Sequence, residues 1–396
     1  MVQPLRGVKV LDFTRVLAGP FATMILGDLG AEIIKVESAQ GDESRSWPPM
    51  LKKGQSGYFM SLNRNKKSMT LNLKDPRARE IIHRMVTEVD VVVENFTPGV
   101  VKRLGIDYEA LSRLHPGIIY CSISGFGQYG SYRDKRAYDP IIQGMTGLMS
   151  ITGESGRAPA KVGIPITDLV AALYAVTAIQ AAYIHGTKSG QGQYLDIALY
   201  DSVLSLLTIM GMEYFATGQA PQRWGLDHIH RVPARAFKAK DNEYVQVAAT
   251  NEVMYPKFCK LLGLEELIDD PRYDTNAKRV ANRHEIMPLF EAKMREKTRA
   301  EWLELFDAAK LPCGPILDLE EVFADPNVAE REMLFDLEHP VEGAVKQLGF
   351  PFKFSATPAA ARLRPPGLGE HTQEILAEWL GYSEAEIELF KKQKVI

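Results

Sequence analysis

Cysteine is scarce in this sequence, and the three that occur are far apart. Among 396 residues, Cys121, Cys259 and Cys313 form no CxxC pair. An odd number of widely spaced cysteines predicts neither a disulfide framework nor a thiolate metal site. The chain also begins without a basic and then apolar leader segment, so we expect a cytoplasmic protein in a reducing compartment.

An excess of charge of one sign is lacking as well. The 47 lysines and arginines nearly balance the 50 aspartates and glutamates, which gives a formal net charge of −3 with neutral histidines. Proteins that follow a phosphate backbone usually carry a basic surplus on at least one segment, and no run of five like charges occurs here. We therefore expect no nucleic-acid partner, and any anionic ligand must be bound by a few well-placed cations.

Uninterrupted apolar runs of membrane-spanning length are also absent. The most apolar stretch, residues 169–186, contains Thr177, Gln180 and His185. Because a spanning helix needs about 20 predominantly apolar residues, this pattern favours a buried helix. No membrane partner is expected.

What the sequence does contain is an alternation of short β-branched runs and longer helical runs from residue 7 onward. This order is typical of parallel strands joined by crossover helices, so it predicts a doubly wound α/β fold. The expected strands are residues 8–13, 32–37, 68–73, 89–94 and 118–122, and the expected helices are residues 21–29, a segment opened by Pro76, and residues 108–115. Residues 125–165 are predicted to be mostly loop, with a long helix from Asp168 after them.

The pattern changes after a further strand and helix at residues 194–215. Residues 218–235 are polar and are interpreted as a linker. Two strands at 236–239 and 244–249, followed by helical segments, predict a smaller α+β domain over residues 236–322. Beyond residue 323, extended segments rich in proline and glycine precede a helix at 373–380, which could return to the first domain.

Single motifs give little information on function. Gly125-Phe-Gly-Gln-Tyr-Gly130 matches GxGxxG, but no apolar helical period follows the third glycine, so a dinucleotide site is disfavoured. His228 and His230 have no suitable partners for zinc, and we expect no metal. Asp168 lies where a loop becomes an apolar helix, which is compatible with a functional carboxylate or with a plain helix cap.

Seven segments, taken together and in order, resemble the class III CoA-transferase family over essentially the whole chain. They are Leu11–Pro20, Leu29–Glu37, Asn63–Ser68, Glu94–Phe96 with Pro98-Gly99, Tyr138-Asp139, Thr167-Asp168 and Leu368–Thr372. The resemblance implies a Rossmann-like large domain formed by N- and C-terminal parts, here residues 1–217 and 323–396, plus the smaller domain. It also implies an interlocked homodimer.

The resemblance further implies a mechanism in which Asp168 is a covalent nucleophile. Its carboxylate would form a mixed anhydride with the acyl group of the donor and then an aspartyl-CoA thioester. Some relatives shield this intermediate with a glycine-rich loop, and no such run occurs between residues 220 and 260. A CoA thioester is then a substrate, and no tightly bound cofactor is expected. By the same resemblance, the CoA-binding residues would be Val16, Ala18, Asn95, Phe96, Arg103, Lys135 and Tyr138.

Two other functions remain open at this point. The racemase branch of the family pairs a histidine with an aspartate, but no histidine occurs between His115 and His185. A non-catalytic CoA-binding protein would use Asp168 only as a cap. The closest similarity is to transferases that move CoA from succinyl-CoA to a small dicarboxylate, so the partners would be an acyl-CoA and a small carboxylic acid. The candidates for binding the second carboxylate are Arg223, His228, His230 and Arg231, although a solvated linker would have the same composition.

Overall fold

The computed structural model describes residues 2–396 and divides them into two compact units. The large unit contains the residues up to 148 together with residues 162–216 and 329–396, and the small unit contains residues 149–161 and 217–328. Both ends of the chain therefore belong to the large unit. The two units are described separately.

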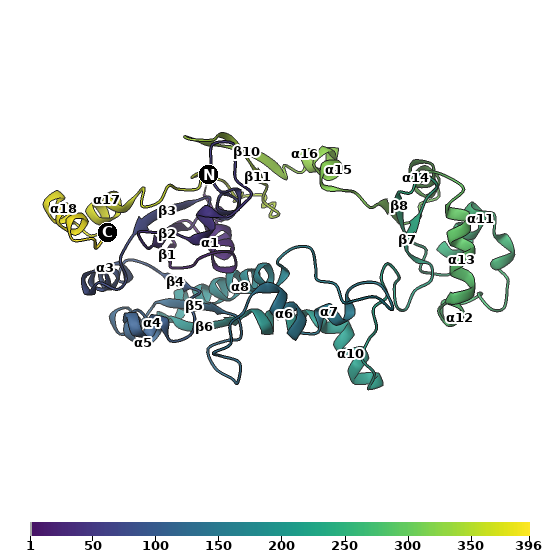
Figure 1. Ribbon diagram of the computed structural model, residues 1–396, viewed down its shortest axis with the longest axis horizontal. Coiled ribbons are helices and arrows are strands. Elements are labelled where there is room, and N and C mark those ends of the chain that lie inside the picture. Colours follow the sequence, from purple (N-terminus) through teal and green to yellow (C-terminus); the bar gives the residue numbers. More distant parts are fainter. Residues whose placement is uncertain (1) are drawn as a thin grey trace. The chain divides into compact units, whose positions relative to one another are not determined.

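The large unit is built on a six-stranded parallel sheet (Figure 1). Its strands are β1 (Lys9–Asp12), β2 (Glu32–Glu37), β3 (Lys66–Thr70), β4 (Val91–Glu94), β5 (Ile119–Ser124) and β6 (Gln193–Ala198). Their order is β3-β2-β1-β4-β5-β6, and every neighbouring pair is parallel. The predicted α/β fold with parallel strands is confirmed.

Successive strand residues face opposite sides of the sheet and enter two different cores. On β4, Val91 and Val93 belong to one buried cluster and Val92 belongs to the other. On β1, Val10 belongs to the first of these clusters and Leu11 to the second. A strand covered on both faces needs apolar residues at nearly every position, which explains why these strands appear in the sequence as continuous β-branched runs.

Helices cover both faces of the sheet. On one face, α1 (Ala18–Asp28) packs against α8 (Ile166–Ser189), and α8 also contacts α9 (Leu199–Leu204). On the other face lie α3 (Pro76–Val86) and α5 (Tyr108–Leu114). The remaining elements of the first 217 residues are η1 (Glu43–Ser46), α2 (Gly57–Met60), α4 (Val100–Leu104), α6 (Asp139–Met145), α7 (Leu148–Ile151), η2 (Ser205–Leu207) and α10 (Thr208–Thr217).

The C-terminal segment returns to the edge of the sheet at β3. The backbone N–H of Ser68 donates to His371 Nδ1 at 3.2 Å, and that of Thr70 donates to Thr372 Oγ1 at 3.0 Å. This segment contains the hairpin β10 (Leu334–His339) and β11 (Gly343–Leu348), then α17 (Thr372–Glu374), the π-helical turn η4 (Ile375–Trp379) and α18 (Glu384–Lys392). The predicted helix at 373–380 corresponds to α17 and η4.

The region predicted to be mostly loop, residues 125–165, contains only the two short helices α6 and α7, so this prediction is confirmed. Two other expectations about secondary structure need correction. The long helix begins at Ile166 rather than at Asp168. The C-terminal part contains a β-hairpin and a final helix that the sequence analysis did not identify. Most residues of that hairpin are exposed or half-buried, so its strands lack a clear apolar pattern.

The small unit contains an antiparallel sheet in the order β7-β8-β9. Its strands are β7 (Ala234–Lys238), β8 (Tyr244–Ala248) and β9 (Cys313–Pro315), and its other elements are α11 (Met254–Leu262), η3 (Glu265–Leu267), α12 (Asn276–Ala281), α13 (Arg283–Met294), α14 (Arg299–Ala308), α15 (Leu319–Ala324) and α16 (Pro326–Glu330). Phe258, Trp302 and Phe306 pack together in its core. As the sequence predicts, two strands precede a run of helices.

Helix α8 differs from the buried helix expected at this position. It is the one helix among residues 2–396 that is long and apolar enough to cross a membrane, although core helices of soluble proteins also meet this criterion. Only one third of its most apolar 18-residue window is buried. Leu173, Tyr174 and Ile184 on this helix are exposed.

Candidate active site

A cavity of about 560 Å³ opens in the large unit at the carboxyl ends of the central strands. The chain turns from β1 in opposite directions along the sheet, toward β2 on one side and β4 on the other. In open α/β sheets, ligands bind outside the carboxyl ends of the strands at such a reversal point. The cavity is lined by segments that follow β1, β4 and β5, together with residues near α6 and α8.

Asp168 lines this cavity from the first turn of α8. Burial, followed by the nearby Asp139 carboxylate, raises the pKa of Asp168 to about 6. The Thr167 hydroxyl and the backbone N–H groups of Asp168 and Ala18 oppose this increase. No lysine or arginine among residues 2–396 forms an ion pair with Asp168. The carboxylate is thus ionised at neutral pH, and no cation neutralises it.

Asp139 holds the start of α8 in place. Its Oδ1 accepts hydrogen bonds from the backbone N–H of Thr167 at 3.1 Å and from the Thr167 hydroxyl at 3.0 Å, and its Oδ2 accepts from Gln143 Nε2 at 2.8 Å. Asp139 therefore fixes the residue before Asp168 and raises the pKa of Asp168 at the same time. The sequence analysis included Asp139 in a family motif but gave it no role.

Two aromatic residues that the sequence analysis missed also line the cavity. Trp47 and Tyr58 pack edge to face, with ring centroids 5.3 Å apart. Burial raises the pKa of Tyr58 to about 12, with further contributions from the charges of Asp168 and Asp42. Tyr58 is therefore a neutral phenol near Asp168 and is able to donate a hydrogen bond. No local motif marks the segment that contains these rings, and only the fold brings it to the cavity.

Most of the residues predicted to bind CoA line the same cavity. They are Val16, Ala18, Asn95, Phe96, Lys135 and Tyr138. Arg103 is exposed on α4 and is not among the lining residues. Four cations from two segments line the cavity, namely Arg15, Arg133, Lys135 and Arg136.

The side chain of Asn95 is already bonded to the protein backbone. Its Oδ1 accepts from the N–H of Arg15 at 2.9 Å, and its Nδ2 donates to the carbonyl oxygen of Arg15 at 2.8 Å. The Asn95 amide thus bonds both the N–H and the carbonyl oxygen of one residue, as a neighbouring strand does in a β-ladder. Asn95 therefore connects the segment after β4 to the segment after β1.

The four residues predicted to bind the second carboxylate lie in the small unit. The guanidinium of Arg223 donates to the carbonyl oxygens of Ser150 at 3.2 Å and Arg157 at 2.6 Å. His228 Nδ1 accepts from the N–H of His230 at 3.1 Å, and burial followed by the nearby positive charges of His230 and Arg231 lowers the pKa of His228. Their role toward substrate stays a prediction.

Arg283, which the sequence analysis missed, adds a further cation to this cluster. It donates to the carbonyl oxygens of His228 and Ile229 and lies over the Trp224 ring, 4.4 Å from its centroid.

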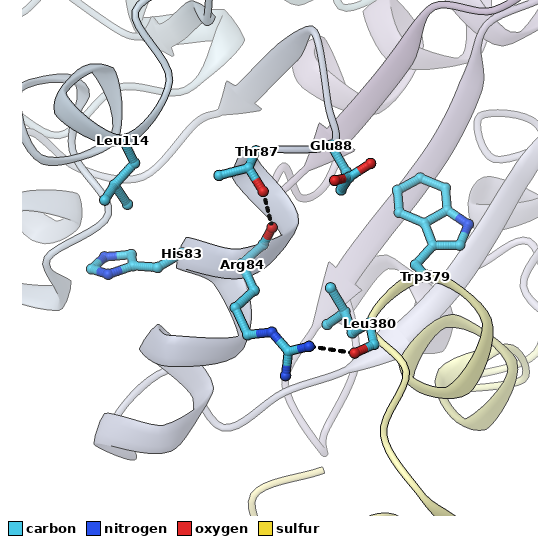
Figure 2. Close-up of a pocket in the computed structure, with 7 residues that line it drawn as sticks. All are labelled: His83, Arg84, Thr87, Glu88, Leu114, Trp379 and Leu380. Carbon is cyan, nitrogen blue, oxygen red and sulfur yellow. Dashed lines mark hydrogen bonds between the residues drawn. The ribbon is translucent and has the colours of Figure 1, made fainter.

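A second cavity of about 390 Å³ in the large unit lies between the end of α3 and the C-terminal segment (Figure 2). Arg84 donates to the carbonyl oxygen of Leu380, and the Thr87 hydroxyl donates to the carbonyl oxygen of Arg84 at 2.8 Å. His83 Nε2 bonds the carbonyl oxygen of Gly105 at 2.9 Å. Arg84 therefore connects α3 to the C-terminal segment, and no nucleophile is paired with a base among the residues that line this cavity.

The glycine motif does not form a dinucleotide loop, in agreement with the sequence analysis. Bends and turns follow Gly130, and the next helix, α6, begins only at Asp139. No helix N-terminus is therefore available at Gly130 for a pyrophosphate. Among residues 2–396, no group of three or more His, Cys, Asp or Glu side chains could hold a metal ion.

Comparisons with known proteins agree with this geometry. Residues 5–372 match the model of CoA-transferase family III. Succinyl-CoA:glutarate CoA-transferase of Mus musculus is 42% identical over 388 residues, which cover 98% of this chain and 89% of the mouse protein. Succinate--glutarate CoA-transferase of Agrobacterium fabrum (strain C58 / ATCC 33970) is 38% identical and covers 95% of each chain.

A solved structure shows the same fold. The crystal structure of a CAIB/BAIF family protein from Brucella suis superimposes with a TM-score of 0.86 at 38% sequence identity, covering 96% of this chain and 100% of that one. The family match spans most of the sequence, and named transferases align over nearly its full length. This protein therefore belongs to CoA-transferase family III and is a CoA-transferase.

Proposed function

We propose that this enzyme moves CoA from succinyl-CoA to a small dicarboxylate of the glutarate type, with Asp168 as the covalent nucleophile. The observation that carries the proposal is the Asp168 carboxylate itself, which lines the cavity without a cationic partner. A carboxylate with a raised pKa is a better nucleophile than an ordinary one, because nucleophilicity increases with basicity. The named relatives support the choice of donor and acceptor.

The reaction would proceed in two symmetrical halves. Asp168 attacks the thioester carbonyl carbon of the donor, the C–S bond breaks, and CoA leaves as a thiolate. The thiolate then attacks the aspartyl carbonyl of the mixed anhydride, which releases the donor carboxylate and leaves CoA bound to Asp168 as a thioester. The acceptor carboxylate attacks this thioester, and the released thiolate attacks the acyl carbonyl of the second anhydride, which regenerates Asp168. No water takes part, and no net proton is consumed.

Two neutral donors near Asp168 would stabilise the oxyanions that form when its carbonyl carbon is attacked. One is the backbone N–H of Ala18 at the start of α1, and the other is the Tyr58 phenol, which stays protonated at neutral pH. Donors placed at the position of developing charge contribute more in a dry site than in water. A catalytic histidine has no place in this scheme, and none occurs among the cavity-lining residues within 2–396.

The cations that line the cavity would bind the phosphates of CoA. Arg15 and the Arg133–Arg136 segment supply four positive charges there, and guanidinium groups match phosphate oxygens in pairs. Phe96 would pack against an apolar part of CoA. Arg103 stays a candidate for a phosphate at the outer end of the ligand. Alanine at Lys135 and Arg136 should raise KM for succinyl-CoA about tenfold with little change in kcat, because both substitutions remove binding rather than chemistry.

We propose that the cationic cluster of the small unit binds the second carboxylate of the acceptor. Arg231 and His230 are exposed there, and an arginine fork suits a carboxylate. Alanine at both should raise KM for glutarate and leave KM for succinyl-CoA nearly unchanged. An unchanged KM for glutarate would contradict this assignment.

We also propose that two copies form the interlocked homodimer implied by the family resemblance. Large apolar side chains on α8 and α10 are exposed in the single chain, including Leu173, Ile184, Ile209, Met212 and Phe215. Such a concentration is unusual on a monomer surface and is typical of an interface. Light scattering after size exclusion should give twice the mass of 44.2 kDa. The three free cysteines fit the proposed cytoplasmic location.

The covalent step is tested by trapping. Enzyme incubated with succinyl-CoA, quenched rapidly and digested should carry a succinyl or CoA adduct on the peptide that contains Asp168. Hydroxylamine should release the adduct, because anhydrides and thioesters react with it. Asp168→Asn should abolish the adduct and lower kcat by at least about a thousandfold. Turnover in the Asp168→Asn variant at a near-normal rate, without an adduct in the wild type, would refute the proposal.

A further inference from the structure

The turn between β1 and α1 contains a residue in a strained conformation. Val16 has φ of 69°, in the left-handed region. Among residues 2–396, six residues other than glycine have positive φ, and Val16 is the only β-branched one. A β-branched side chain in this region is a true outlier, and strain of this kind persists only where the surroundings enforce it. We therefore expect neighbouring groups to hold Val16 in this left-handed conformation.

Four side chains bond the backbone of this turn. Asn95 bonds both the N–H and the carbonyl oxygen of Arg15. Asp42 accepts from the N–H of Val16, with both carboxylate oxygens at 3.2 Å. Lys35 Nζ donates to the carbonyl oxygen of Thr14 at 2.7 Å, and Asp12 Oδ1 accepts from the N–H of Thr14 at 2.8 Å. Three consecutive residues are thus held by side chains from β1, β2 and the segments after β2 and β4.

These holding groups are themselves fixed. Lys35 Nζ also bonds Asp42 Oδ2 at 3.0 Å, and the side chains of both residues are fully buried. A buried ion pair keeps one geometry, because losing a partner would leave an uncompensated charge. Gly19 completes the arrangement, since a Cβ there would lie 2.3 Å from the Thr14 side chain. The turn can therefore fold closely over the start of α1.

The turn leads directly into α1, whose first residue interacts with Asp168. Ala18 is the first residue of α1, and its N–H interacts with Asp168 and favours the charged form of that carboxylate. Leu17 precedes it with φ of −133° and ψ of −67°, outside helical geometry. The direction of the Ala18 N–H therefore depends on the turn before it.

We infer that Asn95 and Asp42 are positioning residues that hold Arg15 and Val16 in the left-handed turn, so that the N–H of Ala18 faces Asp168. This inference rests on the proposed function of Asp168. It gives Asn95 a different role from the CoA contact that the family resemblance implies, because both ends of its amide are used by Arg15. Asn95 would act on kcat rather than on CoA affinity.

Asn95→Ala tests the inference, because Asn95 is only half-buried and carries no charge. We expect kcat to fall about tenfold to a hundredfold, as for a misplaced catalytic group, while KM for succinyl-CoA changes less than about threefold. The acid limb of the kcat/KM profile should move up by about half a pH unit, because Asp168 loses a donor that favours its charged form. If Asn95→Ala folds poorly, Asn95→Leu keeps a similar size, adds no charge and removes both bonds to Arg15, with the same expected shift.

A double-mutant cycle with Val16→Gly separates positioning from general loss of structure. Glycine reaches φ near +69° without strain, so the turn would need less enforcement. The loss of kcat caused by Asn95→Ala should be at least about threefold smaller in the Val16→Gly background than in the wild type. Additive effects, with no such rescue, would contradict the inference. Asn72→Ala is the matched control, because Asn72 is exposed, bonds the backbone carbonyl of Lys394 and does not line the cavity.

Trapping of the Asp168 adduct distinguishes this inference from the proposed function. If the wild type forms no adduct, the function proposed for Asp168 fails. If the wild type forms the adduct, but Asn95→Ala raises KM for succinyl-CoA tenfold and leaves kcat and the acid limb unchanged, Asn95 is a CoA contact and the positioning role is refuted.

Discussion

Two aspartates of the large unit lie in contrasting surroundings. Asp12, at the end of β1, is fully buried, and Lys66 Nζ lies 3.2 Å from its Oδ2. Burial alone would raise the pKa of Asp12, but Lys66, Lys35 and the hydroxyls of Thr14 and Thr23 lower it below its usual value. Asp168 lines the cavity without a cation, and burial together with a second carboxylate raises its pKa.

The difference shows how the surroundings of one residue type can either satisfy its charge or leave it perturbed. The partners of Asp12 satisfy its charge and hold it in one place, so it cannot react. Asp168 keeps an unneutralised charge on the wall of a cavity, which destabilises the fold but leaves the carboxylate free for the nucleophilic role proposed above. Perturbed carboxylates of the second kind are concentrated at functional sites. Substitution of Asp12 should therefore lower the free energy of unfolding, and substitution of Asp168 should raise it.

The largest expected effect comes from Asp12→Asn. It leaves Lys66 buried without its carboxylate partner, while Lys35 keeps Asp42. Removal of one member of a buried pair costs about 3–5 kcal/mol. Burial already lowers the pKa of Lys66 to about 8, so loss of Asp12 should lower it further. The free energy of unfolding, measured in urea, should fall by this amount.

The matched control is an exposed pair of the same unit. Asp336 lies 3.4 Å from Lys346, and both side chains are at least half exposed. Asp336→Asn should change the free energy of unfolding by less than about 1 kcal/mol. If both substitutions changed the free energy of unfolding equally, burial of the Asp12–Lys66 pair would not explain the large effect expected for Asp12→Asn.

Much of the fold could be predicted because it depends on local pattern. The strands of the parallel sheet are short, β-branched and buried on both faces, and the helices between them have clear ends, such as Asp75 and Pro76 at the start of α3. The hairpin β10–β11 was missed because half-exposed strands carry little apolar periodicity, and helix α18 was missed because it is only nine residues long and mostly polar.

The site could be predicted only in part. Asp168 was identified from the Thr167-Asp168 motif by family resemblance, and the structure places it on the cavity. Asp139, Tyr58 and Asp42 were given no role, because their importance depends on contacts between residues that are distant in sequence. Tyr58 and Asp168 are 110 positions apart, and no spacing rule connects them.

Asp168→Asn should stabilise the protein, although the proposed function expects it to abolish activity. The folded-state pKa of about 6 lies above the usual value of 3.8 for an aspartate. The folded state therefore binds more protons between these values, and the contribution of Asp168 to stability is lost as pH rises through 6. At pH 7 the substitution should raise the free energy of unfolding by about 2 kcal/mol, and the gain should shrink at about pH 5. A loss of stability at neutral pH would contradict this account of the cavity.

The smallest effect, and the sharpest test of the electrostatics, is expected for Asp139→Asn. In the proposed mechanism Asp168 reacts in its ionised form, so kcat/KM of the wild type should rise with pH through an apparent pKa near 6. An asparagine side chain carries no charge, and removing the Asp139 charge favours the ionised form of Asp168. The acid limb should therefore move to lower pH by about half a unit. Because an asparagine oxygen can still accept from Thr167, the start of α8 should stay in place. A shift to higher pH would instead mean that Asp139 acts mainly by positioning Thr167.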